Sequence, residues 1–159
     1  MELQDIFNKA HKHFASMEEP SMDTDGQCAY RGNNNNMCIV GAFIPDSLYK
    51  QSLEGDSLDN MKDKIVGTFK EGESFHNTRI TEVLALAFRQ KKLTNNQYLL
   101  LANLQNTHDT YANDFNDGYR HDTDKLSWYE FIKPEIVECA IAFDLEILPD
   151  SRIVYEDVG

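Results

Sequence analysis

The chain has 159 residues, of which 41% are hydrophobic and 11% aromatic. This length and apolar content are typical of one folded domain (1–159) and exclude a disordered protein, which lacks the side chains for a core. The formal net charge of −12 disfavours direct binding to nucleic acid and to anionic membranes, because both attract basic surfaces. It favours a basic partner, although many soluble proteins are acidic without a specific reason.

The cysteines and the amino terminus indicate a location inside the cell. Three cysteines, an odd number, do not suit a fully paired disulfide framework. Residues 1–5 include acidic side chains and lack the apolar run of a secretory signal peptide. No segment reaches the roughly 20 apolar residues of a membrane-spanning helix. We therefore predict a cytoplasmic protein with reduced thiols and no membrane partner.

Apolar residues at helical spacing dominate the chain. They predict a mainly α fold (α+β), a single domain of about five helices with one small β element. A first amphipathic helix is expected over residues 3–17, because its pattern stops before Pro20. Two further helices are expected over residues 58–69 and 80–88.

Two later helices are expected to begin with a capping box, in which the first and fourth side chains bind free backbone N–H groups. Residues 94–97 (Thr-Asn-Asn-Gln) open one helix, and residues 127–130 (Ser-Trp-Tyr-Glu) open the other. Pro134 is expected either to kink the latter or to start a new helix. Residues 113–125 predict a polar loop, and residues 149–159 an edge strand or a loose tail.

The most unusual part of the sequence is residues 28–55, here called the signature segment. Its first part predicts a β-hairpin over residues 27–40, because apolar and β-branched residues flank Gly32 and a tract of four asparagines that tolerates turns. Pro45 and Gly55 then predict two further bends in the chain. This concentration of backbone-special residues indicates an unusual local construction.

The side chains of this segment suggest a polar site. Tyr30, Arg31, Asp46, Tyr49 and Glu54 are the candidate binding residues. Arginine suits an anion or a carboxylate, and a convergent set of such groups can line a pocket. Equally, Arg31 can pair with Asp46 or Glu54 and simply hold the loop in place.

Metal binding is a weaker prediction. Cys28 and Cys38 flank the predicted turn, and His108 is a further donor; His76 and Cys139 are also considered. A structural zinc site needs about four ligands, and this spacing does not resemble Cys-x-x-Cys. The alternative is that the thiols are small apolar groups of the core.

The sequence predicts no catalytic residues and no cofactor. His108 and Asp109 form a pair found in metallohydrolases, but the further ligands of such a site are missing. Two acidic stretches fail as calcium loops because required oxygen ligands are replaced. Phosphate-binding glycine loops and a Gly-x-Ser-x-Gly elbow do not occur.

The pattern Cys-x-Tyr-Arg-Gly, Cys-x-Val-Gly-x-x-Ile-Pro-Asp-x-x-Tyr and Glu-Gly over residues 28–55 resembles a family of short hypothetical proteins from tailed phages and prophages. Leu-Gln-x-x-His-Asp at residues 104–109 also fits, so the resemblance covers residues 1–110. It implies a phage accessory gene expressed in a bacterial cytoplasm. The family has no assigned activity, and residues 33–36 are asparagines where it often has Pro or Gly.

From these observations we expect a non-enzymatic, acidic phage accessory protein that binds and modulates a host protein, of the host-takeover or anti-defence type. One alternative is a small-molecule-binding protein or enzyme that uses the signature segment. A second is a zinc-stabilised structural module. A homodimer paired through the edge of the hairpin is compatible with each of them.

Overall fold

The computed structural model describes residues 1–24, 27–55, 72, 74–75, 77–116 and 127–147. Within these ranges the chain is mainly helical, which confirms the predicted class. None of the described helices has the length and apolar character needed to cross a membrane. The helical elements are α1 (Leu3–Ser16), η1 (Asn33–Asn35), α2 (Ile39–Ala42), η2 (Gln51–Gly55), α3 (Arg79–Ala87), α4 (Asn95–Asn116) and α6 (Trp128–Ala142).

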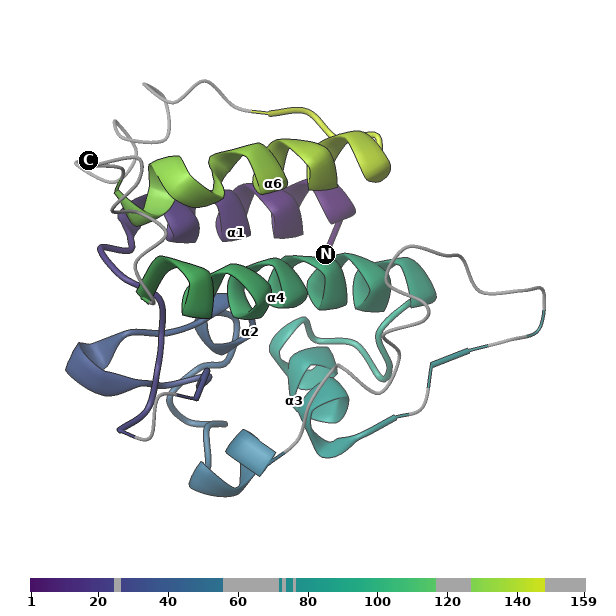
Figure 1. Ribbon diagram of the computed structural model, residues 1–159. Helices are drawn as coiled ribbons and strands as arrows, with labels where there is room; N and C mark the ends of the chain where they lie inside the picture. The colour runs from purple at the N-terminus through teal and green to yellow at the C-terminus, as the bar shows by residue number, and fades with distance from the viewer. Residues whose placement is uncertain (25–26, 56–71, 73, 76, 117–126, 148–159) are drawn as a thin grey trace, which may run out of the picture.

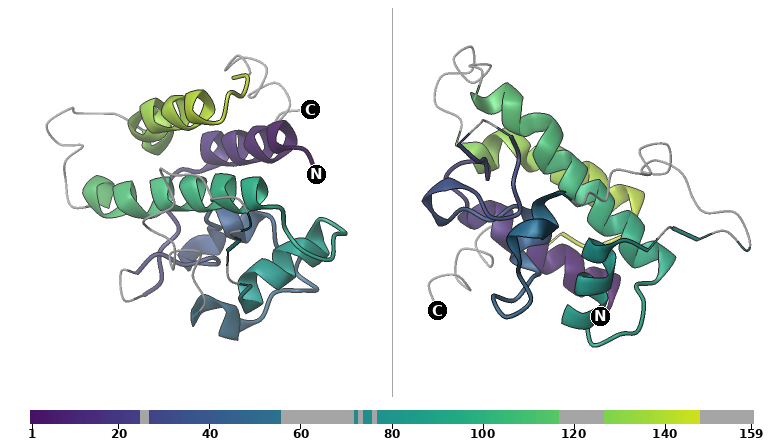
Figure 2. Two further views of the ribbon diagram at one scale, coloured as in Figure 1. Left: turned by 90° about the vertical axis from the view of Figure 1, so that its right-hand side faces the viewer. Right: turned by 90° about the horizontal axis from the view of Figure 1, so that it is seen from below.

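Three long helices form the body of the molecule. Helices α1, α4 and α6 pack against one another, with α4 in the middle of the structure (Figure 1). The short helix α2 contacts both α1 and α4, on the side of α4 away from α6. Figure 2 shows the same order from the side: α6 and α1 lie on one side of α4, and α2 and α3 lie on the other.

The amphipathic pattern of α1 explains its place in the core. Ile6, Phe7, Ala10 and Phe14 share one face and are fully buried. The helix ends at Ser16, since the next residue has an extended backbone. The predicted first helix is therefore confirmed.

The predicted capping box of α4 is confirmed. The Gln97 N–H donates to Thr94 Oγ1 at 3.0 Å, and the Thr94 N–H donates to Gln97 Oε1 at 2.9 Å. In α6 the Glu130 N–H donates to Ser127 Oγ at 3.1 Å, as the second box predicts. Pro134 neither ends α6 nor starts a new helix, because α6 continues through it.

The predicted hairpin over residues 27–40 is not shown. In the described part of the chain this region contains two isolated antiparallel bridges, between Met22 and Cys28 and between Arg31 and Met37. A longer ladder does not form, because neighbouring backbone N–H groups have other acceptors. The backbone N–H groups of Tyr30 and Arg31 donate to the side-chain carboxylate of Glu54, which belongs to η2. Cys38 already caps the next helix, α2.

The predicted polar loop over residues 113–125 begins too early, because α4 continues to Asn116. Buried apolar contacts override the polar composition here: Phe115 lies inside, with its ring centroid 5.4 Å from that of Trp128 on α6. The remainder of this loop, the predicted helix over 58–69 and the tail over 149–159 lie outside the described residues.

Candidate functional site

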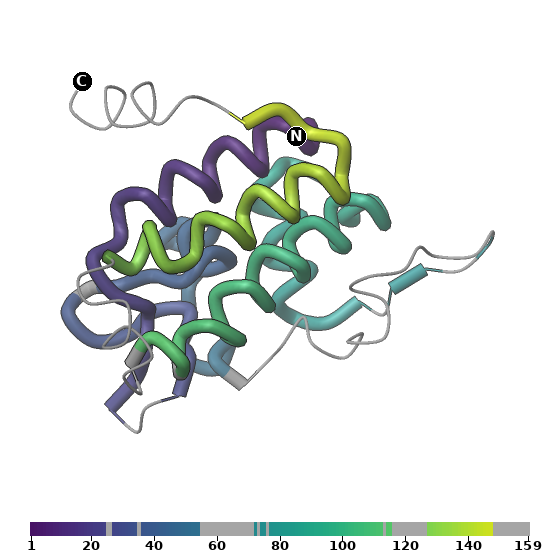
Figure 3. Tube along the Cα trace, turned by 45° about the horizontal axis from the view of Figure 1, so that its top comes forward, coloured from purple at the N-terminus to yellow at the C-terminus, as the bar shows by residue number. Residues whose placement is uncertain are grey.

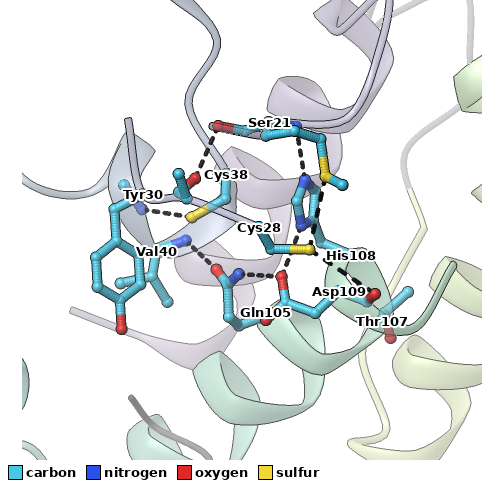
Figure 4. A network of polar contacts seen from close by, with 12 residues as sticks. Ser21, Cys28, Tyr30, Cys38, Val40, Gln105, Thr107, His108 and Asp109 are labelled. Atoms are coloured by element: carbon cyan, nitrogen blue, oxygen red, sulfur yellow. Dashed lines mark hydrogen bonds and ion pairs between the residues drawn. The ribbon is translucent and has the colours of Figure 1, made fainter. Parts of the chain in front are cut away.

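The two parts of the sequence pattern meet in space, where α4 faces the signature segment (Figure 4). Gln105 on α4 is almost fully buried and joins both sides. Its Oε1 accepts the Val40 N–H at 2.9 Å, and its Nε2 donates to Asp109 Oδ1 at 2.8 Å. One side chain of α4 therefore satisfies a buried backbone donor at the start of α2.

His108 is fully buried one turn further along α4. Its Nε2 lies 3.0 Å from the backbone nitrogen of Ser21, and its Nδ1 lies 2.8 Å from Asp109 Oδ1. A backbone N–H can only donate, so Nε2 must accept this hydrogen bond. Nδ1 then carries the proton and donates to the Asp109 carboxylate. In this geometry Nε2 is the acceptor nitrogen and Nδ1 the donor nitrogen of the imidazole.

This arrangement tests the predicted metal site. Ligand atoms of Cys28, His108 and Asp109 lie within 4.8 Å of one another. A metal bound between them would use Nδ1, and the imidazole proton would move to Nε2, directly against the Ser21 N–H. Binding would therefore lose a buried hydrogen bond. Within the described residues, His108 therefore makes two internal contacts that a bound metal would have to displace.

The other cysteines are placed as core residues. Cys38 does not join that cluster: its Sγ accepts the Gly41 N–H at 3.3 Å, and burial raises the pKa of its thiol. Burial also raises the pKa of Cys139 to about 12. All three cysteines are described, and none forms a disulfide. Cys38 and Cys139 are therefore protonated at neutral pH and are poor nucleophiles.

Four of the five predicted binding residues bring their side chains together, on one another, and Tyr30 joins them through its backbone N–H. The Arg31 guanidinium donates to Asp46 Oδ1 at 2.6 Å and to the Ile44 carbonyl at 2.8 Å. Its carbon lies 4.5 Å from the centre of the Tyr49 ring. Of the Arg31 nitrogens, Nε is buried without a hydrogen-bond partner within the described residues, as is Trp128 Nε1 on α6.

Glu54 closes the same cluster. Its carboxylate accepts the N–H groups of Tyr30 and Arg31 at 2.9 and 3.1 Å, and the Tyr49 hydroxyl at 2.6 Å. Burial and this contact with Glu54 raise the pKa of Tyr49 to about 12. Three donors on one carboxylate leave little capacity for a ligand. Sequence reasoning offered a pocket or a pinned loop, and the geometry favours the pinned loop.

The glycines of the signature segment allow close backbone approach. A Cβ on Gly41 would lie 2.0 Å from the Tyr30 carbonyl oxygen, and one on Gly32 would lie 2.5 Å from the Met22 carbonyl oxygen. Asn34 adopts a left-handed φ of 60°, which asparagine tolerates well. The unusual composition is thereby explained by how the backbone is built.

Sequence reasoning missed a groove between α4 and α6. It has a volume of about 320 Å³ and is lined by Asn103, Asn106, Thr107, Thr110, Tyr111, Glu135, Glu138, Cys139 and Ala142. The α4 residues follow i, i+3, i+4, i+7 spacing, so a polar helical stripe was the available signal. In the described part of the chain the side chains of Asn103, Asn106 and Glu138 make no hydrogen bond or ion pair.

The tyrosine at one end of the groove is partly committed. The Tyr111 hydroxyl is hydrogen bonded to the carboxylate of Glu135. Burial and this carboxylate raise the pKa of Tyr111. Tyr111 also packs edge-on against Phe131, with 6.1 Å between the ring centroids. Glu138, which also lines the groove, is exposed.

Comparison with known proteins adds no assignment: no protein-family model, curated protein or solved structure matches the chain.

Proposed function

We propose that this protein is a non-enzymatic, acidic accessory protein of a tailed phage that binds and modulates a host protein in the bacterial cytoplasm. The observation that carries the proposal is that the polar side chains of the signature segment bond to one another. Arg31 is bound to Asp46, and the Glu54 carboxylate already accepts three donors. The segment that sequence reasoning selected as a site is thereby better suited to shaping the fold.

The geometry gives less support to an enzyme. A cysteine nucleophile needs a nearby base with a free lone pair. The histidine nearest to Cys28 is His108, whose Nε2 accepts the Ser21 N–H and whose Nδ1 carries a proton. The small-molecule and zinc alternatives lose support for the same reason, because their candidate groups are engaged in internal bonds.

A protein partner is supported by the surface of α6. Ile141 is 66% exposed, and it lies one turn from the exposed Glu138. An apolar contact with a polar rim is a common arrangement at protein–protein interfaces. The net charge of −12 favours a partner with a basic surface.

Reciprocal capture tests the proposal. The tagged chain is expressed in infected bacteria, one host protein is expected to co-purify in stoichiometric amount, and that host protein, tagged in turn, should recover the chain. Adding the purified chain should then change the activity of the host protein. Failure to recover any host protein in either direction, with folding verified by circular dichroism, would overturn the proposal. Light scattering on the same sample tests the predicted homodimer.

A further inference from the structure

We propose that the groove between α4 and α6 is the docking site, and that it receives an arginine-bearing segment of the partner protein. This inference rests on the proposed function, since it names the surface and the partner chemistry through which that function would act. The two helices lie side by side and run in opposite directions (Figure 3), so each contributes one wall.

The groove offers acceptors and negative charge. Glu135 and Glu138 of α6 and Asn103 and Asn106 of α4 all line the groove; Glu135 is hydrogen bonded to Tyr111, so Glu138 is the carboxylate left for a partner. The lining residues include no lysine or arginine. A guanidinium carries five donors in a planar fork and no acceptor, so it matches a wall of carboxylate and amide oxygens.

The shape and the apolar lining fit the same occupant. Cys139 and Ala142 are small and provide an apolar part of the wall against which the methylene stem of an arginine can lie. The volume of about 320 Å³ suits one or two side chains and is at the lower limit of small-molecule pockets, which start at roughly 300 Å³. Exposed Ile141 supplies an apolar contact beside the charged one.

The helix itself provides a second, independent observation. Asn103, Asn106, Thr107 and Thr110 form one stripe of α4, and asparagine and threonine disfavour helices by roughly 0.5 kcal/mol each relative to alanine. The side-chain amides of Asn103 and Asn106 make no hydrogen bond within the described residues. Thr107 does gain an internal hydrogen bond, from its hydroxyl to the Asn103 carbonyl at 3.0 Å, so the observation rests on the two asparagines. A residue choice that opposes folding without an internal gain is expected where a side chain serves a partner.

The docking site is tested on the full chain by comparing a charge reversal in the groove with a matched charge reversal outside it. Glu138→Lys changes the groove. Glu146→Lys makes the same charge change at an exposed residue that lies outside the groove, after the end of α6. The probe is an acetylated, amidated hexa-arginine peptide, titrated into ¹⁵N-labelled protein while the side-chain amide signals of Asn103 and Asn106 are followed.

We expect the largest shifts at these two amides and at the backbone of the groove. Glu138→Lys should lower the affinity for the peptide by about tenfold, and Glu146→Lys should lower it by less than about twofold. Shifts spread over the whole acidic surface, equal losses in both variants, or no binding of the peptide would overturn the docking site. Circular dichroism of both variants verifies that each is folded.

The same two variants separate this inference from the proposed function. If the wild-type chain captures a host protein and both variants lose it to the same extent, the partner binds elsewhere. The docking site then fails while the proposed function stands. If no host protein is captured but the peptide binds in the groove and is lost only with Glu138→Lys, the proposed function fails while the groove remains a cation site.

Discussion

The signature segment and the α4–α6 groove differ in how their polar groups are used. In the signature segment, Arg31, Tyr49 and Glu54 bind one another or the backbone. In the groove, the side chains of Asn106 and Glu138 make no hydrogen bond within the described residues. Residues that look unusual in a sequence can have all their polar groups engaged in holding the local backbone in place. Ordinary helical residues can form the surface that remains available.

The largest expected effect is a loss of stability when a side chain is added at a close backbone contact of the signature segment. In a typical helix Gly→Ala gains up to about 1 kcal/mol. In α2, the new Cβ of Gly41→Ala would lie 2.0 Å from the Tyr30 carbonyl oxygen, which is backbone and cannot rotate away. We expect a loss of about 3 kcal/mol in the free energy of unfolding, the upper end of the usual range for overpacking, measured by urea denaturation. A gain in stability would show that this close approach is wrong.

A neutral substitution separates the two regions next. Glu54→Gln keeps the shape but replaces one acceptor oxygen with an NH₂ group facing the donors of Tyr30, Arg31 or Tyr49. We expect a loss of about 1–3 kcal/mol in stability. The matched control Glu138→Gln should change stability by less than about 0.5 kcal/mol, because its side chain is exposed. Equal losses in both variants would remove the contrast between the regions.

His13 provides a pH test of the contact between α1 and the turn. Burial lowers the pKa of His13 below its ordinary value of 6.5, while its Nε2 lies 2.6 Å from the Met37 carbonyl oxygen. The unfolded chain therefore takes up this proton at a higher pH than the folded chain, and stability from this group falls as the pH drops through 6.5.

His13→Gln keeps an N–H donor but removes the titration. Between about pH 7.5 and about pH 5.5, we expect wild type to lose stability relative to this variant, as measured by urea unfolding at each pH. Parallel stability curves for the two proteins would mean that His13 has no lowered pKa.

The smallest effect is expected at the exposed end of the signature segment. Asp46 accepts from Arg31 at 2.6 Å, but its side chain is 94% exposed, so water and salt screen the pair. Asp46→Ala should cost less than about 1 kcal/mol, and this loss should shrink when salt is added. A loss above about 2 kcal/mol that does not respond to salt would place the pair in the structural core of the segment.

Features governed by neighbouring residues could be predicted from the sequence. The apolar stripe of α1 and the capping box of α4 are set by residues one to four positions apart, and both were confirmed. Pairing of Arg31 with Asp46 or Glu54 was foreseen as an alternative. The structure shows this pairing alternative, in which Arg31 holds the loop through Asp46.

Features that depend on backbone donors or on tertiary contacts could not be predicted. The bonds from the backbone of Tyr30 and Arg31 to Glu54, and from Ser21 to His108, involve N–H groups that every non-proline residue has. The sequence therefore gives no signal for them, and a hairpin was expected instead. The groove requires α4 and α6 to lie side by side, although the amide and hydroxyl stripe of α4 was visible.

Paired measurements on Glu54→Gln and Glu138→Lys test the central claim most directly. For each variant, the free energy of unfolding and the affinity for the hexa-arginine peptide are measured on the same preparation. We predict that Glu54→Gln loses stability and keeps peptide affinity, whereas Glu138→Lys keeps stability and loses affinity. If Glu54→Gln instead keeps its stability and loses the peptide while Glu138→Lys still binds it, the signature segment is the binding site and the account is wrong.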